Sequence, residues 1–119
     1  MLGETAAGLR TAAMIADQRL SVPAHFDAEV YAVFRRLFRN HLLARGRLDL
    51  IARRLIALAA ERVSLPALLP AAHALADAVS ASDAFYLALA RVQDADLLTF
   101  DARLAKAATR LARVRLMTV

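Results

Sequence analysis

The fold is decided by residues 80–108, which read SASDAFYLALARVQDADLLTFDARLAKAA. Ser80 and Asp83 have the S-x-x-D spacing of a capping box, and the apolar-periodic run that follows predicts a helix over Ala84–Val92. The short apolar run Leu97–Thr99 is typical of a buried strand, and the last part of the segment has helical periodicity. A helix, a strand and a helix in this order favour an α/β protein, in which ligands bind at the carboxyl ends of the strands.

Two carboxylates accompany these elements, and each has two interpretations. Asp83 lies in the first turn of the predicted helix, while Asp101 follows the strand Leu97–Thr99 and opens the next helix. Acidic residues are common at helix starts because they accept hydrogen bonds from free N–H groups and interact favourably with the helix dipole. The same placement is also typical of an α/β active site. A third acid upstream therefore carries weight in choosing between the two interpretations.

Length and composition restrict the class of protein. The chain has 119 residues, which is the size of one domain, and 60% of them are hydrophobic, which is ample for a core. There is no cysteine, so a disulfide framework and a thiolate metal site are excluded. Charged residues interrupt every apolar run before it reaches membrane-spanning length, and the first residues lack the pattern of a signal peptide. We expect a cytoplasmic protein.

The charge balance favours a polyanionic partner. Sixteen Lys and Arg against eleven Asp and Glu give a formal net charge of +5, and every basic residue except Lys106 is an arginine. Arginine makes bidentate contacts to phosphate and carboxylate groups, so RNA or an acidic peptide is a suitable partner. A genome rich in Arg and Ala codons would produce the same composition, and the two explanations have similar weight.

Strand-like and helical segments alternate along the rest of the chain. We predict helices over Glu4–Asp17, Ala24–Asn40, Asp49–Leu58 and Ala67–Ala78, and strands over Leu20–Val22, Arg62–Leu65 and Arg113–Met117. This alternation predicts an α/β fold in which a short, mostly parallel sheet is flanked by helices in three layers. Because the strands are short and few, an all-helical bundle with loops in place of strands is the competing architecture.

Glu29 is the third acid of interest, inside the predicted helix Ala24–Asn40. A lone glutamate beside an apolar stripe is usually a surface residue, but here Arg36 lies on the same helical row, seven positions later. His25 precedes Glu29 by four positions, which also permits a metal pair on one helix face. A single H-x-x-x-E pair is common by chance, so a metal role for His25 has little support from the sequence alone.

Three segments together resemble one known family. SVPAHFDAEVYAVFRRL contains Glu29, VSASDAFYLALA contains Asp83, and DADLLTFDARLAKAA contains Thr99 and Asp101. In motif and spacing they resemble the PIN domain, and specifically the VapC-type toxins of bacterial toxin–antitoxin pairs. The resemblance covers nearly the whole chain and implies a single PIN-like three-layer domain over residues 1–119. No single motif is specific, but the combination of three acids is.

The resemblance implies an endoribonuclease that depends on Mg²⁺ or Mn²⁺, forms a homodimer and is silenced by a cognate antitoxin. Glu29, Asp83 and Asp101 would be the catalytic metal ligands, and Thr99 would support them by hydrogen bonding. Hard divalent cations prefer oxygen ligands, and a bound cation both activates water and stabilises charge on phosphoryl oxygens. The residues expected to meet RNA phosphates or the antitoxin are Arg36 and, with less support, Arg35 and Arg39.

The chain departs from the family pattern at its start. The family begins with an apolar strand that carries an Asp ligand, and Met1–Glu4 instead matches the end of the following helix. We therefore expect feeble cleavage by the 119-residue chain, a gap or an unusual pairing beside Leu97–Thr99, and a natural gene with roughly fifteen to twenty-five further residues before Met1.

Three hypotheses for function remain open on these grounds. The first is a metal-dependent ribonuclease toxin, and the second is an impaired PIN-fold module that binds antitoxin or RNA without cleaving. The third is an all-helical interaction protein in which the three acids are only caps. Convergence of the acids in an α/β fold separates the third hypothesis from the others.

Overall fold

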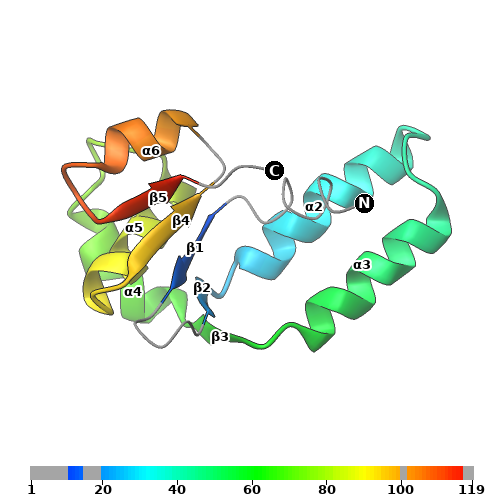
Figure 1. The fold of residues 1–119 in the computed structure, drawn as a ribbon, viewed down its shortest axis with the longest axis horizontal. Helices are drawn as coiled ribbons and strands as arrows, with labels where there is room; N and C mark the ends of the chain where they lie inside the picture. Colours follow the sequence, from blue (N-terminus) through cyan, green and yellow to red (C-terminus); the bar gives the residue numbers. More distant parts are fainter. Residues whose placement is uncertain (1–10, 15–19, 100–101, 117–119) are drawn as a thin grey trace.

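The computed structural model describes residues 11–14, 20–99 and 102–116, and it has an α/β architecture (Figure 1). The strands are β1 (Thr11–Met14), β2 (Leu20–Pro23), β3 (Ala60–Val63), β4 (Asp96–Thr99) and β5 (Val114–Leu116). The helices are α2 (Phe26–Arg39), α3 (Arg45–Ala57), α4 (Leu65–His73), α5 (Ala81–Val92) and α6 (Ala102–Ala108). The predicted α/β class is confirmed, and the all-helical alternative is excluded.

All the strands form one sheet in the order β3-β2-β1-β4-β5. β2 pairs with β3 and β4 pairs with β5 in parallel, whereas β1 runs antiparallel to both of its neighbours, β2 and β4. Because β2 and β4 are each antiparallel to β1, they run in the same direction as each other. Four of the five strands thus share one direction, as the prediction of a mostly parallel sheet requires.

β1 corrects one prediction and confirms another. The helix predicted over Glu4–Asp17 is wrong at Thr11–Met14, and the rest of that range lies outside the described residues. Alanine favours a helix locally, but the backbone groups of β2 and β4 need partners, and a strand between them supplies these on both sides. The unusual pairing expected beside Leu97–Thr99 is this reversed strand, with Thr11 opposite Thr99 and Met14 opposite Asp96.

The strand predicted at Arg62–Leu65 begins and ends earlier, because a helix cap follows it. The Ser64 hydroxyl accepts a hydrogen bond from the Ala67 backbone N–H at 3.3 Å, which makes Ser64 the N-cap of α4. Pro66 is suited to the first turn of that helix, where no N–H donor is needed. Leu65 is therefore helical, and β3 pairs through Ala60–Val63.

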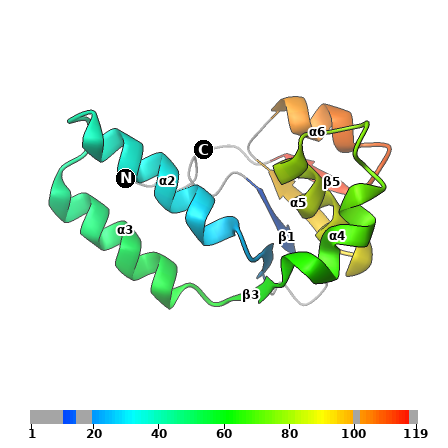
Figure 2. The ribbon, with the colours of Figure 1, turned by 180° about the vertical axis from the view of Figure 1, so that it is seen from behind.

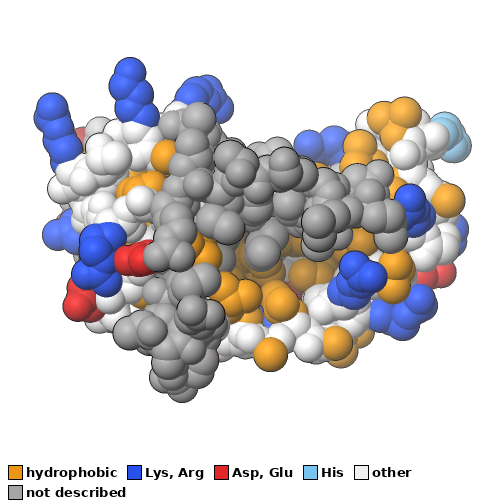
Figure 3. Space-filling model, in the orientation of Figure 1, with side chains coloured by type: hydrophobic (Ala, Val, Ile, Leu, Met, Phe, Trp, Pro, Cys, Tyr) orange, Lys and Arg blue, Asp and Glu red, His pale blue; other side chains and the backbone are white. Residues whose placement is uncertain are grey.

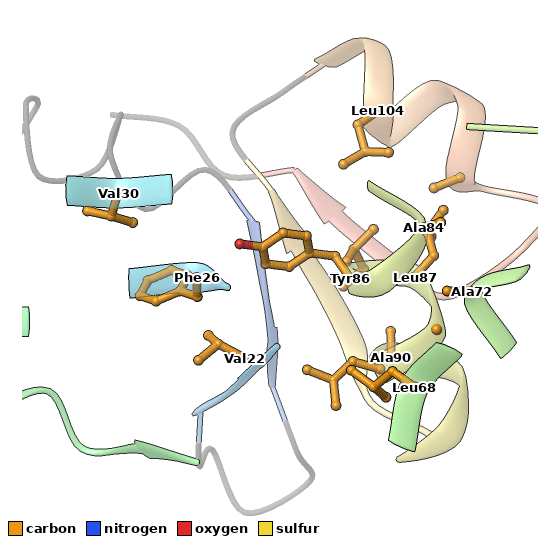
Figure 4. Packing of buried hydrophobic residues seen from close by; sticks show 14 of the residues in the cluster. Val22, Phe26, Val30, Leu68, Ala72, Ala84, Tyr86, Leu87, Ala90 and Leu104 are labelled. Atoms are coloured by element: carbon orange, nitrogen blue, oxygen red, sulfur yellow. The ribbon is translucent and has the colours of Figure 1, made fainter. Parts of the chain in front are cut away.

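Helix α5 lies at the centre of the core. It contacts β1, β2 and β4 on one side and α4 on the other, while α6 packs against β4 and β5. Leu87, Ala88 and Leu89 of α5 are fully buried, and Leu68 of α4 and Leu97 of β4 lie in the same cluster (Figure 4). Each large apolar side chain buried here stabilises the fold by about 1.5–3 kcal/mol.

Helices α2 and α3 pack on each other and project from the sheet, which gives the molecule its long axis (Figures 1 and 2). Phe26, Val30 and Phe34 form the buried stripe of α2. The opposite face of α2 is open to solvent. No helix in the described ranges is long and apolar enough to cross a membrane.

The central place of β1 generates a prediction about stability. Ala13→Pro should lower the free energy of unfolding by at least about 1–3 kcal/mol, because proline removes an N–H donor and leaves a buried carbonyl without its partner. Urea unfolding followed by circular dichroism measures this change. The matched control is Ala81→Pro at the exposed first position of α5, where proline is tolerated. Equal stability of the two variants would contradict the central pairing of β1.

Candidate active site

Glu29 and Asp83 lie in the first turns of two different helices. Glu29 is in the first turn of α2, which begins three residues after β2 ends. Asp83 is in the first turn of α5, where the Ser80 hydroxyl accepts a hydrogen bond from the Asp83 backbone N–H at 3.3 Å. Ser80 is thereby confirmed as the N-cap. The two helix starts are joined by side chains, and Glu29 is the centre of that junction.

Side chains of α5 hold the carboxylate of Glu29 from the other helix. The Ser82 hydroxyl donates a short hydrogen bond to Oε2, and the Tyr86 hydroxyl donates to Oε1 at 2.7 Å. His25 Nε2 lies 3.3 Å from Oε1 and 3.1 Å from the Ser82 Oγ. Figure 4 shows the Tyr86 hydroxyl pointing from α5 toward α2. The carboxylate is thus fixed in orientation while 42% of the Glu29 side-chain surface remains exposed.

The His25 ring completes this cluster as a packing and hydrogen-bonding group. Its centroid lies 5.1 Å from that of Tyr86 and 5.5 Å from that of Phe85. A proton on Nε2 suits both neighbours, since the Glu29 oxygen is an acceptor and the Ser82 proton is already committed to Glu29. Nδ1 is buried and has no hydrogen-bond partner among the described residues.

Tyr86 experiences the negative charge of both acids. Burial raises the pKa of Tyr86, and the hydrogen bond to Glu29 and the charges of Glu29, Asp83 and Asp27 raise it further. The hydroxyl therefore remains a protonated donor. Asp83 is half-buried and precedes Tyr86 by three positions, so the two residues share one side of α5. The Tyr86 hydroxyl thus contacts Glu29 directly, and Asp83 acts on it only through its charge.

A separate ion pair fixes the start of α2. The Arg62 guanidinium donates from Nε and Nη2 to both carboxylate oxygens of Asp27, at 3.1 and 2.9 Å. It also donates to the backbone carbonyls of Leu55, Leu58 and Ala60, which lie at the end of α3 and in β3. The Arg62 side chain thereby connects α2, α3 and the sheet. Its partner on α2, Asp27, lies two residues before Glu29.

The other predicted site residues have different positions. Thr99 is fully buried at the carboxyl end of β4. Asp101 lies outside the described residues, directly before α6. Arg35, Arg36 and Arg39 are exposed on the solvent face of α2.

The sequence did not predict Ser82 and Tyr86 as partners of Glu29. Ser82 and Tyr86 are four positions apart on α5, and His25 and Glu29 are four positions apart at the start of α2. This spacing is the one feature of the sequence that could have indicated that the members of each pair are neighbours. It identifies one face of each helix but not which two faces meet. Only His25, the N-cap residue of α2, and Glu29 in its first turn were recognised as neighbours.

The donor set suits a hard divalent cation. Glu29 and Asp83 supply carboxylate oxygens, and Mg²⁺ typically takes one or two carboxylates together with water and substrate phosphate. Among the described residues, no group of three acidic or histidine side chains is close enough to hold a metal. The third predicted ligand, Asp101, is not among them. The residues present therefore fit the chemistry of such a cation without defining its full coordination.

Comparison with known proteins shows the family to which the chain belongs. The profile of the PIN domain matches residues 2–110, and the chain belongs to the PIN domain family. Its relatives include Ribonuclease VapC3 of Mycobacterium tuberculosis, in the strains CDC 1551 / Oshkosh and ATCC 25618 / H37Rv. Each is 36% identical over 95 residues, which cover 80% of this chain and 69% of the relative. The resemblance to VapC-type members of the family is confirmed.

The junction between α2 and α5 generates a prediction about stability. Tyr86→Phe should lower the free energy of unfolding by about 1–3 kcal/mol, because a hydrogen bond to a charged group is lost inside the junction. The matched control is Tyr31→Phe on the exposed face of α2, which should leave stability unchanged. Chemical denaturation of both variants at neutral pH makes the comparison.

The same pair of variants has an expected pH dependence. The folded protein holds the Tyr86 proton more tightly than the unfolded chain does, since the pKa of Tyr86 is raised on folding. This contribution is fully present below the ordinary tyrosine pKa of about 10 and is lost as the pH rises above it. The stability difference between the wild type and Tyr86→Phe should therefore shrink above pH ~10. A difference that grew with pH would contradict the protonated donor.

Proposed function

We propose that this protein is a divalent-metal-dependent endoribonuclease toxin of a toxin–antitoxin pair that acts in the cytoplasm and hydrolyses RNA phosphodiester bonds. The observation that carries the proposal is the Glu29 carboxylate, which Ser82 and Tyr86 orient between the first turns of α2 and α5, the second of which also contains Asp83. Membership of the PIN domain family and the likeness to Ribonuclease VapC3 support the reaction class.

In this proposal Glu29, Asp83 and Asp101 hold Mg²⁺ or Mn²⁺. The bound cation would activate water and neutralise charge on the phosphoryl oxygens. Ser82 and Tyr86 contribute by fixing the Glu29 carboxylate before substrate arrives, so little reorganisation is needed during the reaction. Thr99 ends β4 two residues before Asp101, and we propose that it orients a carboxylate or the substrate by hydrogen bonding.

Electrostatics gives the cation a second role in the proposal. Like charges disfavour ionisation of neighbouring carboxylates, so a cluster of acids tends to take up a proton when no cation is present. A divalent cation would offset this tendency for the whole cluster.

The second candidate function is an RNA- or antitoxin-binding module that does not cleave. It is favoured by Arg35, Arg36 and Arg39, which are exposed on α2 and suit a polyanionic partner whether or not cleavage follows. Measurements of binding and cleavage on the same protein separate the two candidates. Binding without metal-dependent cleavage would support the module, and cleavage would support the nuclease.

Substitution of the acids tests the nuclease proposal. Asp83→Asn and Glu29→Gln should each reduce Mg²⁺-dependent cleavage of a fluorogenic RNA by at least about a hundredfold, because the metal and the attacked phosphate lose their alignment. Mn²⁺ binding, measured by electron paramagnetic resonance, should weaken in parallel. The matched control is Asp77→Asn, an exposed acid between α4 and α5. Unchanged Mn²⁺ titrations in both site variants would reject the site.

We also propose a homodimer and a cognate antitoxin as partners. Large apolar side chains are exposed around the projecting helix pair, including Leu42 at 72% and Ile56 at 84%, and their burial would favour association. Sedimentation equilibrium of the purified chain should give a dimer at micromolar concentration. A monomer across that range would reject the dimer.

A further inference from the structure

The solvent face of α2 carries a hollow of about 440 Å³ outside the junction with α5. We call it the α2 cradle. Its lining residues are Ala28, Tyr31, Ala32, Arg35, Arg36 and Arg39. The arginines and the alanines are exposed, and 38% of the Tyr31 surface is accessible.

Helical periodicity explains the form of the cradle. Ala28, Ala32, Arg35 and Arg39 recur at spacings of three or four and therefore share one face of α2. The side chains of Ala28 and Ala32 are too short to fill the space between the longer side chains, so these two residues line the bottom of the hollow. Arg36 lies on the same helical row as Glu29, about 10 Å farther along the helix axis. The cradle thus extends along α2 from the candidate active site.

The positive charge of the cradle is not neutralised within the described part of the chain. Arg35, Arg36 and Arg39 form no ion pair with any residue that the structure describes. Asp27 is also on α2, but its carboxylate is paired with Arg62 of β3 and does not pair with the arginines of the cradle. Figure 3 shows Lys and Arg side chains around the rim of the molecule and few acidic ones.

In the cradle, the exposed ring of Tyr31 lies beside three guanidinium groups that form no ion pair with a described residue. This combination of an aromatic ring and positive charge favours one chemical class of ligand. Guanidinium groups bind phosphates in bidentate fashion, and aromatic side chains stack on unpaired bases. A duplex presents phosphates but keeps its bases stacked inside, and an acidic peptide presents carboxylates without a flat base. Only a single-stranded nucleic acid uses both features of the cradle.

We propose that the α2 cradle binds a single-stranded segment of RNA, with phosphates on Arg35, Arg36 and Arg39 and one unpaired base stacked on Tyr31. The choice of RNA rests on the proposed function. A strand bound in this way runs along α2 and brings its backbone toward Glu29. The cradle then contributes to substrate affinity and selects unpaired segments, and it takes no part in the chemical step.

Fluorescence anisotropy with a labelled oligouridine of about twelve nucleotides tests the proposal. EDTA is present, so neither cleavage nor a metal enters the measurement. Tyr31→Ala should weaken binding roughly fivefold to a hundredfold without changing the salt dependence, whereas Tyr31→Phe should bind as the wild type does. The triple variant Arg35→Gln, Arg36→Gln, Arg39→Gln should reduce the slope of log K against log salt by about 2, as expected for three lost phosphate contacts on a single strand.

Controls define what would overturn the proposal. Arg91→Gln removes one exposed arginine at the end of α5 and should leave binding unchanged. Wild-type affinity in the cradle variants, or no binding of oligouridine by the wild type, would overturn the proposal. Equal affinity for duplex RNA that does not depend on Tyr31 would also overturn it. If an oligo-glutamate peptide required the three arginines while oligouridine did not, the cradle would belong to a protein partner instead.

The outcome is separable from that of the proposed function. Cleavage is measured on the same wild-type protein with Mg²⁺ present. Cleavage together with unaltered binding in the cradle variants rejects the cradle alone. Binding through the cradle without any cleavage rejects the nuclease and leaves the cradle in place.

Discussion

The whole arrangement depends on the backbone pairing of a four-residue strand. Among the described strands, β1 alone links the parallel pair β2–β3 to the parallel pair β4–β5. β2, in the first of these pairs, leads into α2 and therefore to Glu29. Thr99 ends β4, in the second pair. α5, which carries Asp83 and Tyr86, packs on β1 and on both of its neighbours. The relative position of the acids is thus set by hydrogen bonds that β1 makes on both sides.

Side-chain contacts at the start of α2 then orient the carboxylates of Asp27 and Glu29. Glu29 meets two hydroxyl donors on α5, and the neighbouring Asp27 meets the Arg62 guanidinium. The two acids are two positions apart on one helix, so they point in different directions and are held by different elements. Asp27 is paired with the Arg62 guanidinium, whereas Glu29 accepts hydrogen bonds from the Ser82 and Tyr86 hydroxyl groups and keeps part of its side chain exposed. The same first turn therefore contains one structural carboxylate and one suited to bind a cation.

Local patterns predicted those elements whose determinants lie within a few residues. Ser80 and Asp83 form a cap only three positions apart, and the sequence of α5 is itself largely apolar, so both were predicted correctly. β3 and the start of α4 were each predicted two residues too late because the capping role of Ser64 was not recognised, and the predicted end of α4 at Ala78 lies five residues beyond His73. β1 was missed altogether, since the strand state of Thr11–Met14 depends on pairing with β2 and with β4, which lies more than eighty positions away, while alanine by itself favours a helix.

Prediction of the site has the same limit. Glu29 and Asp83 were found through the family resemblance, since neither differs locally from an ordinary acid at a helix start. Their hydroxyl partners were not found, because Ser82 and Tyr86 lie more than fifty positions from Glu29 and meet it only when the sheet aligns α2 with α5. The α2 cradle is different in this respect. All its residues belong to one helix, so their common face follows from periodicity alone, and only their lack of acidic partners within the described chain needed the structure.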